Sequence, residues 1–285
     1  MELIYGKDVA DILTKEIVYK VSALARENKR LPKLAIVRVG EKPGDISYEK
    51  SAIKCMEKCG IEHVECTFSE DVDKGVFLSG FKKINVDKNI DGILVLRPLP
   101  KDMDEAVAGK IAPDKDVDCI SHYNMGKLLA GEKDCFAPCT ALAVEKTLKY
   151  ILDKKGESLR GKKVTIVGRS TVVGKPLSLL LTGDDATVTL CHTKTVNLAR
   201  ECAAADILVA AAGSAKLIKE EHVKEGAILT DVGVNMDENG KLVGDIDLFD
   251  VGDKALFATP VPKGIGAVTT TILAMQVLKA RMMHE

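Results

Sequence analysis

The sequence predicts an α/β protein with two lobes: an N-terminal α/β domain with a parallel sheet, then a C-terminal Rossmann-type domain. Three observations predict this class. Short β-branched runs alternate with segments of helical periodicity, the order that gives a parallel sheet covered by helices. One run, Lys163–Val167, leads into a turn flanked by Gly168 and Gly174, with Pro176 where a helix would take its first turn. The final segment carries an apolar stripe at helical spacing, and we expect this helix to pack back onto the first lobe.

Composition sets the class of protein. The 285 residues are 46% hydrophobic and 29% charged, the profile of a soluble globular protein with a substantial core. A formal net charge of −1 gives no electrostatic argument for a nucleic-acid partner. The first residues, MELIYGKDVA, do not resemble a signal peptide, and no apolar run approaches the ~20 residues of a membrane span. We therefore expect a cytoplasmic protein with no membrane or nucleic-acid partner.

The eight cysteines could suggest a metal site or disulfides. They are Cys55, Cys59, Cys66, Cys119, Cys135, Cys139, Cys191 and Cys202. No C-x-x-C occurs, and the two C-x-x-x-C pairs lie far apart without histidines at ligand spacing. We expect reduced thiols and no metal.

The first lobe shows three strand candidates separated by helices. In chain order the expected elements are a helix over Lys7–Asn28, a strand at Leu34–Val39, a helix over Ile46–Cys59, a strand at Ile61–Thr67, a helix to about Lys88 and a strand at Asp91–Leu96. Gly60 is a good residue to end the second helix. Two prolines then break the pattern at Arg97–Pro100, and Ala112–Ser121 is a polar loop. Loops after strand carboxyl ends line the ligand crevice of open α/β sheets, so we expect substrate there.

The second lobe begins after a long helix predicted over Thr140–Leu152. Its expected strands are Lys163–Val167, Ala186–Cys191, Asp206–Ala210, Ala227–Val232 and Ala255–Thr259. The loop Pro260–Gly266 precedes the last helix. We place the domain boundaries at residues 1–139 with 268–285 for the first lobe, and 140–267 for the second.

The glycine-flanked turn predicts an anion site, because backbone N–H groups and the helix dipole both face a phosphate there. It departs from G-x-G-x-x-G, since Ser170 stands at the middle glycine. The acid that usually holds the adenosine ribose is missing after the second strand, which ends in Cys191 and continues His192-Thr193-Lys194. Arg169 lies within the turn. This combination favours NADP over NAD, unless Arg169 and Lys194 are simply solvated surface residues.

Several short motifs together carry a resemblance to a known family. They are Ser47-Tyr48, Pro98-Leu99-Pro100, Lys115-Asp116-Val117-Asp118, Pro138-Cys139-Thr140, Val167-Gly168-Arg169-Ser170 with Val173-Gly174-Lys175-Pro176, Cys191-His192-Thr193-Lys194-Thr195, Asp231-Val232-Gly233-Val234-Asn235, Gly244-Asp245-Ile246-Asp247 and Thr259-Pro260-Val261-Pro262. In this order, over nearly the whole chain, they resemble the methylenetetrahydrofolate dehydrogenase/cyclohydrolase family. Spacing alone would stop at a two-lobed nucleotide-binding protein, with Tyr48 and Asp118 read as ordinary packing and loop residues.

The resemblance implies a homodimer that oxidises methylenetetrahydrofolate to methenyltetrahydrofolate with NADP. It assigns the contacts to NADP to Gly168, Arg169, Ser170, Thr193 and Val234. It also implies a folate site at Tyr48, Pro98 and Asp118, with Tyr48 against the aromatic part and Asp118 hydrogen-bonding the pterin. Tyr48 and Asp118 would be its catalytic residues. In bifunctional members water then opens the ring to 10-formyltetrahydrofolate.

Two positions depart from the family pattern. The catalytic lysine expected four residues after Tyr48 is Ala52, and the glutamine expected two residues before Pro98 is Leu96. Hydride transfer chiefly needs two positioned ligands, whereas ring opening needs a tuned acid/base. Our hypothesis is that the dehydrogenase remains and the cyclohydrolase is weak or absent.

Three alternatives stay open at this point. The protein could be fully bifunctional, with Arg97 or a histidine in place of the lysine. It could be a non-catalytic folate- or nucleotide-binding protein, although such a protein need not keep a cofactor site. It could also be an amino- or hydroxy-acid dehydrogenase with the same cofactor lobe, which only the substrate would distinguish.

Overall fold

The computed structural model describes residues 1–100 and 103–284. Contacts divide the chain into two compact units: unit 1 comprises Met1–Asp11 and Thr140–Thr269, and unit 2 comprises Ile12–Cys139 and Thr270–Glu285. Two long helices, α1 (Gly6–Arg26) and α10 (Ile265–Met283), each contribute residues to both units. Among the described helices, none combines the length and apolarity needed to cross a membrane.

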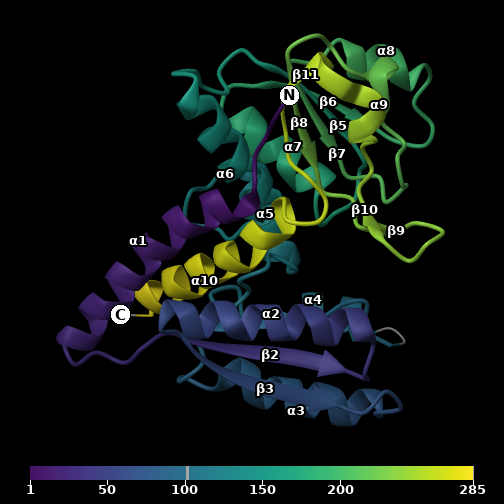
Figure 1. Ribbon diagram of the computed structural model, residues 1–285. Helices are drawn as coiled ribbons and strands as arrows, with labels where there is room; N and C mark the ends of the chain where they lie inside the picture. Colours follow the sequence, from purple (N-terminus) through teal and green to yellow (C-terminus); the bar gives the residue numbers. More distant parts are fainter. Residues whose placement is uncertain (101–102, 285) are drawn as a thin grey trace. The chain divides into compact units, whose positions relative to one another are not determined.

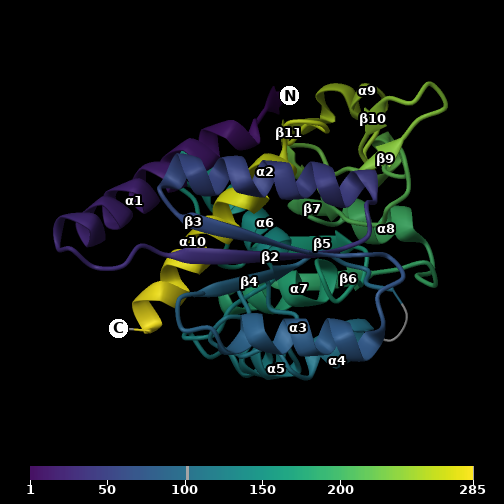
Figure 2. The same cartoon turned by 90° about the horizontal axis from the view of Figure 1, so that it is seen from below.

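Unit 2 is built on a three-stranded parallel sheet in the order β3–β2–β4. The strands are β2 (Lys33–Val39), β3 (Glu62–Phe68) and β4 (Gly92–Val95). Figures 1 and 2 show α2 (Pro43–Cys59) and α3 (Lys74–Val86) on opposite faces of this sheet. Gly60 ends α2 in the left-handed conformation, as the sequence predicts.

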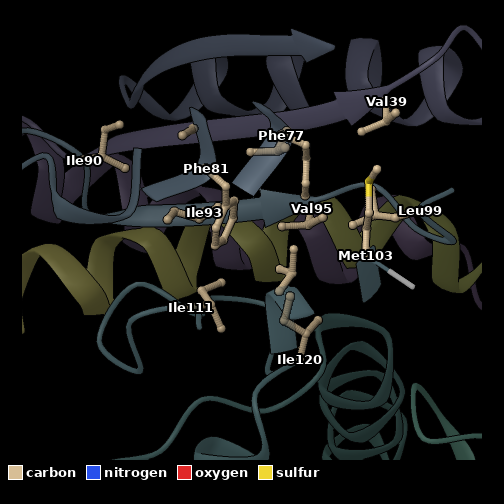
Figure 3. Packing of buried hydrophobic residues seen from close by; sticks show 13 residues of the cluster. Val39, Phe77, Phe81, Ile90, Ile93, Val95, Leu99, Met103, Ile111 and Ile120 are labelled. Carbon is tan, nitrogen blue, oxygen red and sulfur yellow. The ribbon is translucent and has the colours of Figure 1, made fainter. Parts of the chain in front are cut away.

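The core of unit 2 follows the period-2 alternation of its central strand. Ala35, Val37 and Val39 point to one face, where Phe77 and Phe81 of α3 pack against them. Figure 3 shows this cluster. It also contains Leu99 and Ile120, one from each of the two loops that follow the sheet, together with Met103 and Val107 of the helix Met103–Ala108 and with Ile111. Both loops are therefore anchored by a buried side chain, which limits how far their other residues can move.

Unit 1 is a six-stranded parallel sheet in the order β1–β11–β8–β7–β5–β6. The strands are β1 (Glu2–Leu3), β5 (Lys163–Val167), β6 (Thr187–Cys191), β7 (Ile207–Ala210), β8 (Ala227–Asp231) and β11 (Ala255–Ala258). From β5 the chain moves outward to β6 and then returns to the other side as β7. This reversal between β5 and β7 is the place where open α/β sheets bind ligands, outside the strand carboxyl ends.

The helices of unit 1 connect these strands. They are α6 (Cys139–Lys154), α7 (Gly174–Gly183), α8 (Leu198–Ala203) and α9 (Leu248–Val251), with short 3₁₀ turns at Glu220–His222 and Gly252–Lys254. The predicted α/β class with two parallel sheets is confirmed, and each predicted strand is present to within one or two residues at either end.

Some elements were not predicted from the sequence. They are β1, the helices α4 (Met103–Ala108) and α5 (His122–Ala130), and a small hairpin of β9 (Asn235–Met236) and β10 (Leu242–Val243). The first eleven residues, which we had assigned to the first lobe, group with unit 1 instead. The reason is that β1 pairs in parallel with β11, Glu2 opposite Phe257 and Leu3 opposite Ala258. In both cartoon views the N-terminus lies next to β11.

Candidate active site

The turn between β5 and α7 admits only glycine at two positions. Gly168 has a φ of +128°, and a Cβ there would overlap the carbonyl oxygen of Ala211. A Cβ on Gly174 would overlap the carbonyl oxygen of Gly168. The turn therefore folds tightly back on itself, which brings the start of α7 close to the end of the strand.

The same turn exposes polar groups at the N-terminus of α7. The Ser170 hydroxyl accepts the Val173 N–H at 3.0 Å, and the Ser170 carbonyl accepts the Lys175 N–H at 3.0 Å. Val173, which precedes the helix, provides no side-chain cap. Arg169 and Ser170 are exposed. An ordered turn with a positive helix end and an exposed guanidinium fits an anionic ligand such as a dinucleotide phosphate.

The segment after β6 lies beside this turn. Val167 at the end of β5 pairs with Cys191 at the end of β6. Arg169 and Thr193 stand two residues after these partners, so both lie beyond the carboxyl ends of neighbouring strands. His192 forms a tight turn here: its N–H donates to the Thr195 hydroxyl at 2.8 Å. Thr193 is exposed, and no carboxylate stands in this turn. A basic and hydroxyl-bearing edge fits a 2′-phosphate better than a free ribose.

Two buried carboxylates organise the loops after β7 and β8. Asp245 accepts hydrogen bonds from the N–H groups of Ala212 at 2.6 Å and Ser214 at 2.8 Å. Asp231 accepts the Asp245 N–H at 3.0 Å. Burial raises the pKa of Asp231 to about 6, against the backbone N–H groups that act to lower it. Val234, in the loop so held, is 69% exposed. Both acids belong to motifs that carry the family resemblance, but the sequence analysis assigns neither of them a role.

In unit 2, α2 carries Tyr48 and Ala52 one turn apart on the same face. Ala52 is fully buried, whereas Tyr48 is half-buried. Burial raises the pKa of the Tyr48 phenol well above its usual range, and the nearby Asp118 carboxylate raises it further. Tyr48 is therefore a neutral hydroxyl at physiological pH, in the neighbourhood of Asp118.

Asp118 lies in the loop after β4. One hydrogen bond holds its carboxylate, and others hold the loop around it. The Cys139 N–H donates to Asp118 Oδ1 at 3.0 Å. Within the loop itself, the fully buried Asp116 accepts the N–H groups of Ile120 at 2.8 Å and Ser121 at 2.9 Å. Burial raises the pKa of Asp118, while the Cys139 N–H and the Arg97 guanidinium lower it. Arg97 thus brings a positive charge to this carboxylate.

The strand end at β4 supplies the remaining predicted residues. Leu96 is 5% exposed, and its aliphatic side chain offers no polar group to the site. Pro98 is exposed, and its carbonyl oxygen accepts the Lys42 ammonium at 3.0 Å. The Leu99 N–H donates to the Asp104 carboxylate at 3.2 Å.

The predicted residues fall into two groups. Gly168, Arg169, Ser170 and Thr193 meet at one sheet edge of unit 1, and Val234 follows another strand end of the same sheet. In unit 2, Tyr48 lies near Asp118. The contact from Cys139 to Asp118 was not foreseen, although the motif that contains Cys139 had been noticed. All eight cysteines are free thiols.

Comparisons with known proteins cover nearly the whole chain. Residues 4–118 match the catalytic-domain model of the tetrahydrofolate dehydrogenase/cyclohydrolases, and residues 138–285 match their NAD(P)-binding-domain model. The bifunctional protein FolD of Clostridioides difficile is 48% identical over 280 residues, 98% of this chain and 96% of the relative. The crystal structure of the bifunctional FolD of Campylobacter jejuni superposes with a TM-score of 0.93 at 35% identity, over 100% of both chains. The Trypanosoma brucei enzyme, solved with NADP and an inhibitor, gives 0.90 at 32% identity, over 99% of this chain and 97% of that one.

Proposed function

Because the chain belongs to the tetrahydrofolate dehydrogenase/cyclohydrolase family, we propose that it oxidises 5,10-methylenetetrahydrofolate to 5,10-methenyltetrahydrofolate with NADP. Its cyclohydrolase step is weak or absent. Ala52 is the observation that supports the loss of the cyclohydrolase step. The family resemblance implies an acid/base lysine at this position, one helical turn after Tyr48, and the chain has a fully buried methyl group there.

The cofactor side of this proposal uses the edge of the unit 1 sheet. Gly168 and Ser170 would receive the dinucleotide phosphates, Arg169 and Thr193 the 2′-phosphate, and Val234 the nicotinamide half. The tight glycine turn, the uncapped start of α7 and the exposed Arg169 fit such an anion. When bound, NADP accepts a hydride from the substrate.

The folate side uses Tyr48, Pro98 and Asp118. Asp118 would accept hydrogen bonds from pterin N–H groups, since it is held in place through one oxygen by Cys139. Tyr48 would lie against the aromatic part of the folate. The hydride leaves the methylene carbon as a neighbouring nitrogen lone pair forms the C=N bond, so the chain has only to hold the substrate in one orientation.

Ring opening makes a different demand on the chain. Water must lose a proton as it adds to the methenyl carbon, and the departing ring nitrogen must gain one. A positioned acid/base contributes roughly 10²–10⁴-fold to such a step. Ala52 carries no ionisable group, and the buried Leu96 carries no amide with which to orient one.

A fully bifunctional enzyme is the second candidate, and two observations favour it. The relatives of Clostridioides difficile and Campylobacter jejuni are both named as bifunctional proteins. In addition, Arg97 brings a cation to Asp118 from the strand end that also holds Leu96. In this case the proton transfers would use a group on a different element from Ala52.

Two rates on one purified sample test the proposal. One is NADP reduction with methylenetetrahydrofolate, and the other is hydrolysis of methenyltetrahydrofolate. Fast reduction with negligible hydrolysis supports the proposal, and comparable rates support the bifunctional alternative. Binding of both ligands without any turnover would indicate a non-catalytic protein and sink both. Repeating the reduction with NAD tests the cofactor assignment.

We also propose a homodimer, on the strength of the family resemblance. Light scattering during size-exclusion chromatography should give twice the mass of one chain. A mass of one chain at micromolar concentration would contradict this.

A further inference from the structure

A buried amide on α10 makes three hydrogen bonds to the backbone of unit 2. Gln276 is 3% exposed. Its Nε2 donates to the carbonyl oxygen of Val117 and, at 2.8 Å, to that of Ala137, while its Oε1 accepts the Ala137 N–H at 3.2 Å. A glutamine amide has two N–H groups and one carbonyl oxygen, so each of its groups has a backbone partner here.

The two backbone segments that Gln276 joins are those that hold Asp118. Val117 directly precedes Asp118, and Ala137 stands two residues before Cys139, whose N–H donates to Asp118 Oδ1 at 3.0 Å. The Cys139 thiol lies 3.4 Å from the Val117 carbonyl oxygen and 3.3 Å from Gln276 Nε2. Gln276, Val117, Cys139 and Asp118 therefore form one closed arrangement of hydrogen bonds.

We propose that Gln276 is a positioning residue for Asp118, holding the 117–118 and 137–139 segments together so that the Cys139 N–H fixes one oxygen of the carboxylate. The other oxygen is then presented in a defined direction. Cys139 lies 21 residues from Asp118 in the sequence, so this geometry requires a tie between separate segments. Gln276 is that tie. The role rests on the proposed function only where Asp118 is said to bind the pterin.

The chemistry of the site explains why an amide is needed. An apolar side chain would leave the Ala137 carbonyl oxygen and N–H without their partner, and would leave the Val117 carbonyl oxygen with only the weak Cys139 thiol donor. A carboxylate could still accept the Ala137 N–H, but it would face the carbonyl oxygens of Val117 and Ala137 with negative charge. Without the tie the Cys139 N–H moves away from Asp118. The pKa of Asp118 then rises, because this N–H is one of the groups that lower it.

Gln276→Met and Gln276→Glu test the proposal, with Lys279→Met as the matched control. Lys279 lies one turn further along α10 and donates to the Cys135 carbonyl oxygen at 2.6 Å, so it ties the same helix to the same loop without reaching the Asp118 segment. We expect both Gln276 variants to lower kcat/KM for methylenetetrahydrofolate roughly 10- to 100-fold, the worth of a hydrogen bond to a charged group. The acid side of their pH profile of kcat/KM should move to higher pH, and their KM for NADP should stay unchanged. The control variant should keep wild-type values of all three quantities.

A double variant distinguishes positioning from general damage. On an Asp118→Asn background, Gln276→Met should cost little more, because two residues that act as one unit are not additive. Additive losses, or wild-type kinetics in both Gln276 variants, would overturn the role. Gln276→Met and Gln276→Glu differ in chemistry, so the test survives if one of them misfolds. Near-UV circular dichroism would reveal misfolding.

One further readout does not depend on turnover. The carboxyl ¹³C resonance of Asp118, followed by NMR against pH, should titrate at higher pH in both Gln276 variants than in the wild type and in Lys279→Met. An unchanged titration would refute the inference. If the wild type fails to reduce NADP while this shift appears, then the proposed function is wrong and the positioning role stands.

Discussion

At the scale of single residues, Ala52 and Leu96 are the positions at which the family resemblance leads us to expect a lysine and a glutamine. Both are buried, at 0% and 5% exposure. A lysine introduced at position 52 would be desolvated, which lowers the pKa of its ammonium toward the range useful for proton transfer. A glutamine at position 96 would give that lysine a hydrogen-bonding partner.

We therefore expect the double variant Ala52→Lys/Leu96→Gln to hydrolyse methenyltetrahydrofolate about 10²-fold faster than the wild type. The measurement is loss of methenyltetrahydrofolate absorbance, corrected for the uncatalysed rate. Ala52→Met is the control, since it adds a side chain of similar length without the amine. A double variant no faster than Ala52→Met would mean that ring opening depends on another group.

Arg97 allows a prediction of pH dependence. Its guanidinium lowers the pKa of Asp118, which burial raises. Removing the cation therefore raises this pKa, and a higher pH is then needed to ionise the carboxylate. In Arg97→Met we therefore expect the acid side of the pH profile of kcat/KM for methylenetetrahydrofolate to move to higher pH.

The control for this prediction is Arg97→Lys, which keeps the positive charge and should keep the wild-type profile. A profile that moves to lower pH, or not at all, would show that Asp118 is not the group titrating. Hydrolysis measured on the same variants tests the bifunctional alternative, because Arg97 is its candidate for proton transfer.

At the scale of elements, the helix α7 requires glycine at its first residue but not at its last. Gly174 opens the helix against the backbone of Gly168, whereas Gly183 closes it with open space around its Cα. The same substitution at the two ends should therefore have opposite effects.

Gly174→Ala should lower the free energy of unfolding by about 1–3 kcal/mol, the usual cost of overpacking. It should also raise the KM for NADP. Gly183→Ala should be neutral or stabilising by up to about 1 kcal/mol, because alanine favours the helix. Urea unfolding and NADP kinetics measure both effects. Equal stability of the two variants would contradict the tight turn described above.

The elements that sequence could predict are those with a local signal. Several strands of both sheets are buried along most of their length and appear as short apolar runs, such as Lys163–Val167 and Gly92–Val95. The strand β1 has two residues and exists only because it pairs with β11, more than 250 residues away. No local pattern contains that information, and the same pairing places Met1–Asp11 in unit 1.

The candidate site was predictable to a different depth in its two halves. Residue spacing alone indicated the glycine turn and an anion site, because strand, turn and helix are adjacent in the chain. Tyr48 and Asp118 became candidates only through family resemblance, since each is an ordinary residue in its local context. The roles of Gln276 and Cys139 were not predictable from local sequence. Gln276 contacts Val117 across 159 positions, and Cys139 contacts Asp118 across 21.

At the scale of the whole molecule, the two groups of candidate residues belong to different units. The cofactor residues lie within Thr140–Thr269, and Tyr48, Pro98 and Asp118 lie within Ile12–Cys139. Each unit orders its own loops by hydrogen bonds: the Ala212 N–H donates to Asp245 in unit 1, and the Cys139 N–H donates to Asp118 in unit 2. NADP binding should therefore be separable from folate binding.

Hydrogen exchange measured by mass spectrometry tests this separation. NADP alone should protect amides of the turns at 168–175, 192–195 and 211–214, because a ligand that binds only the folded state suppresses local opening where it is held. Asp118→Asn should show the same protection and the same NADP affinity as the wild type, while losing turnover. Gly174→Ala should lose the protection at all three turns together, since the phosphate turn is the part it deforms. Protection by NADP that centres on residues 12–139, or that disappears in Asp118→Asn, would mean that the cofactor residues assigned to unit 1 are wrong.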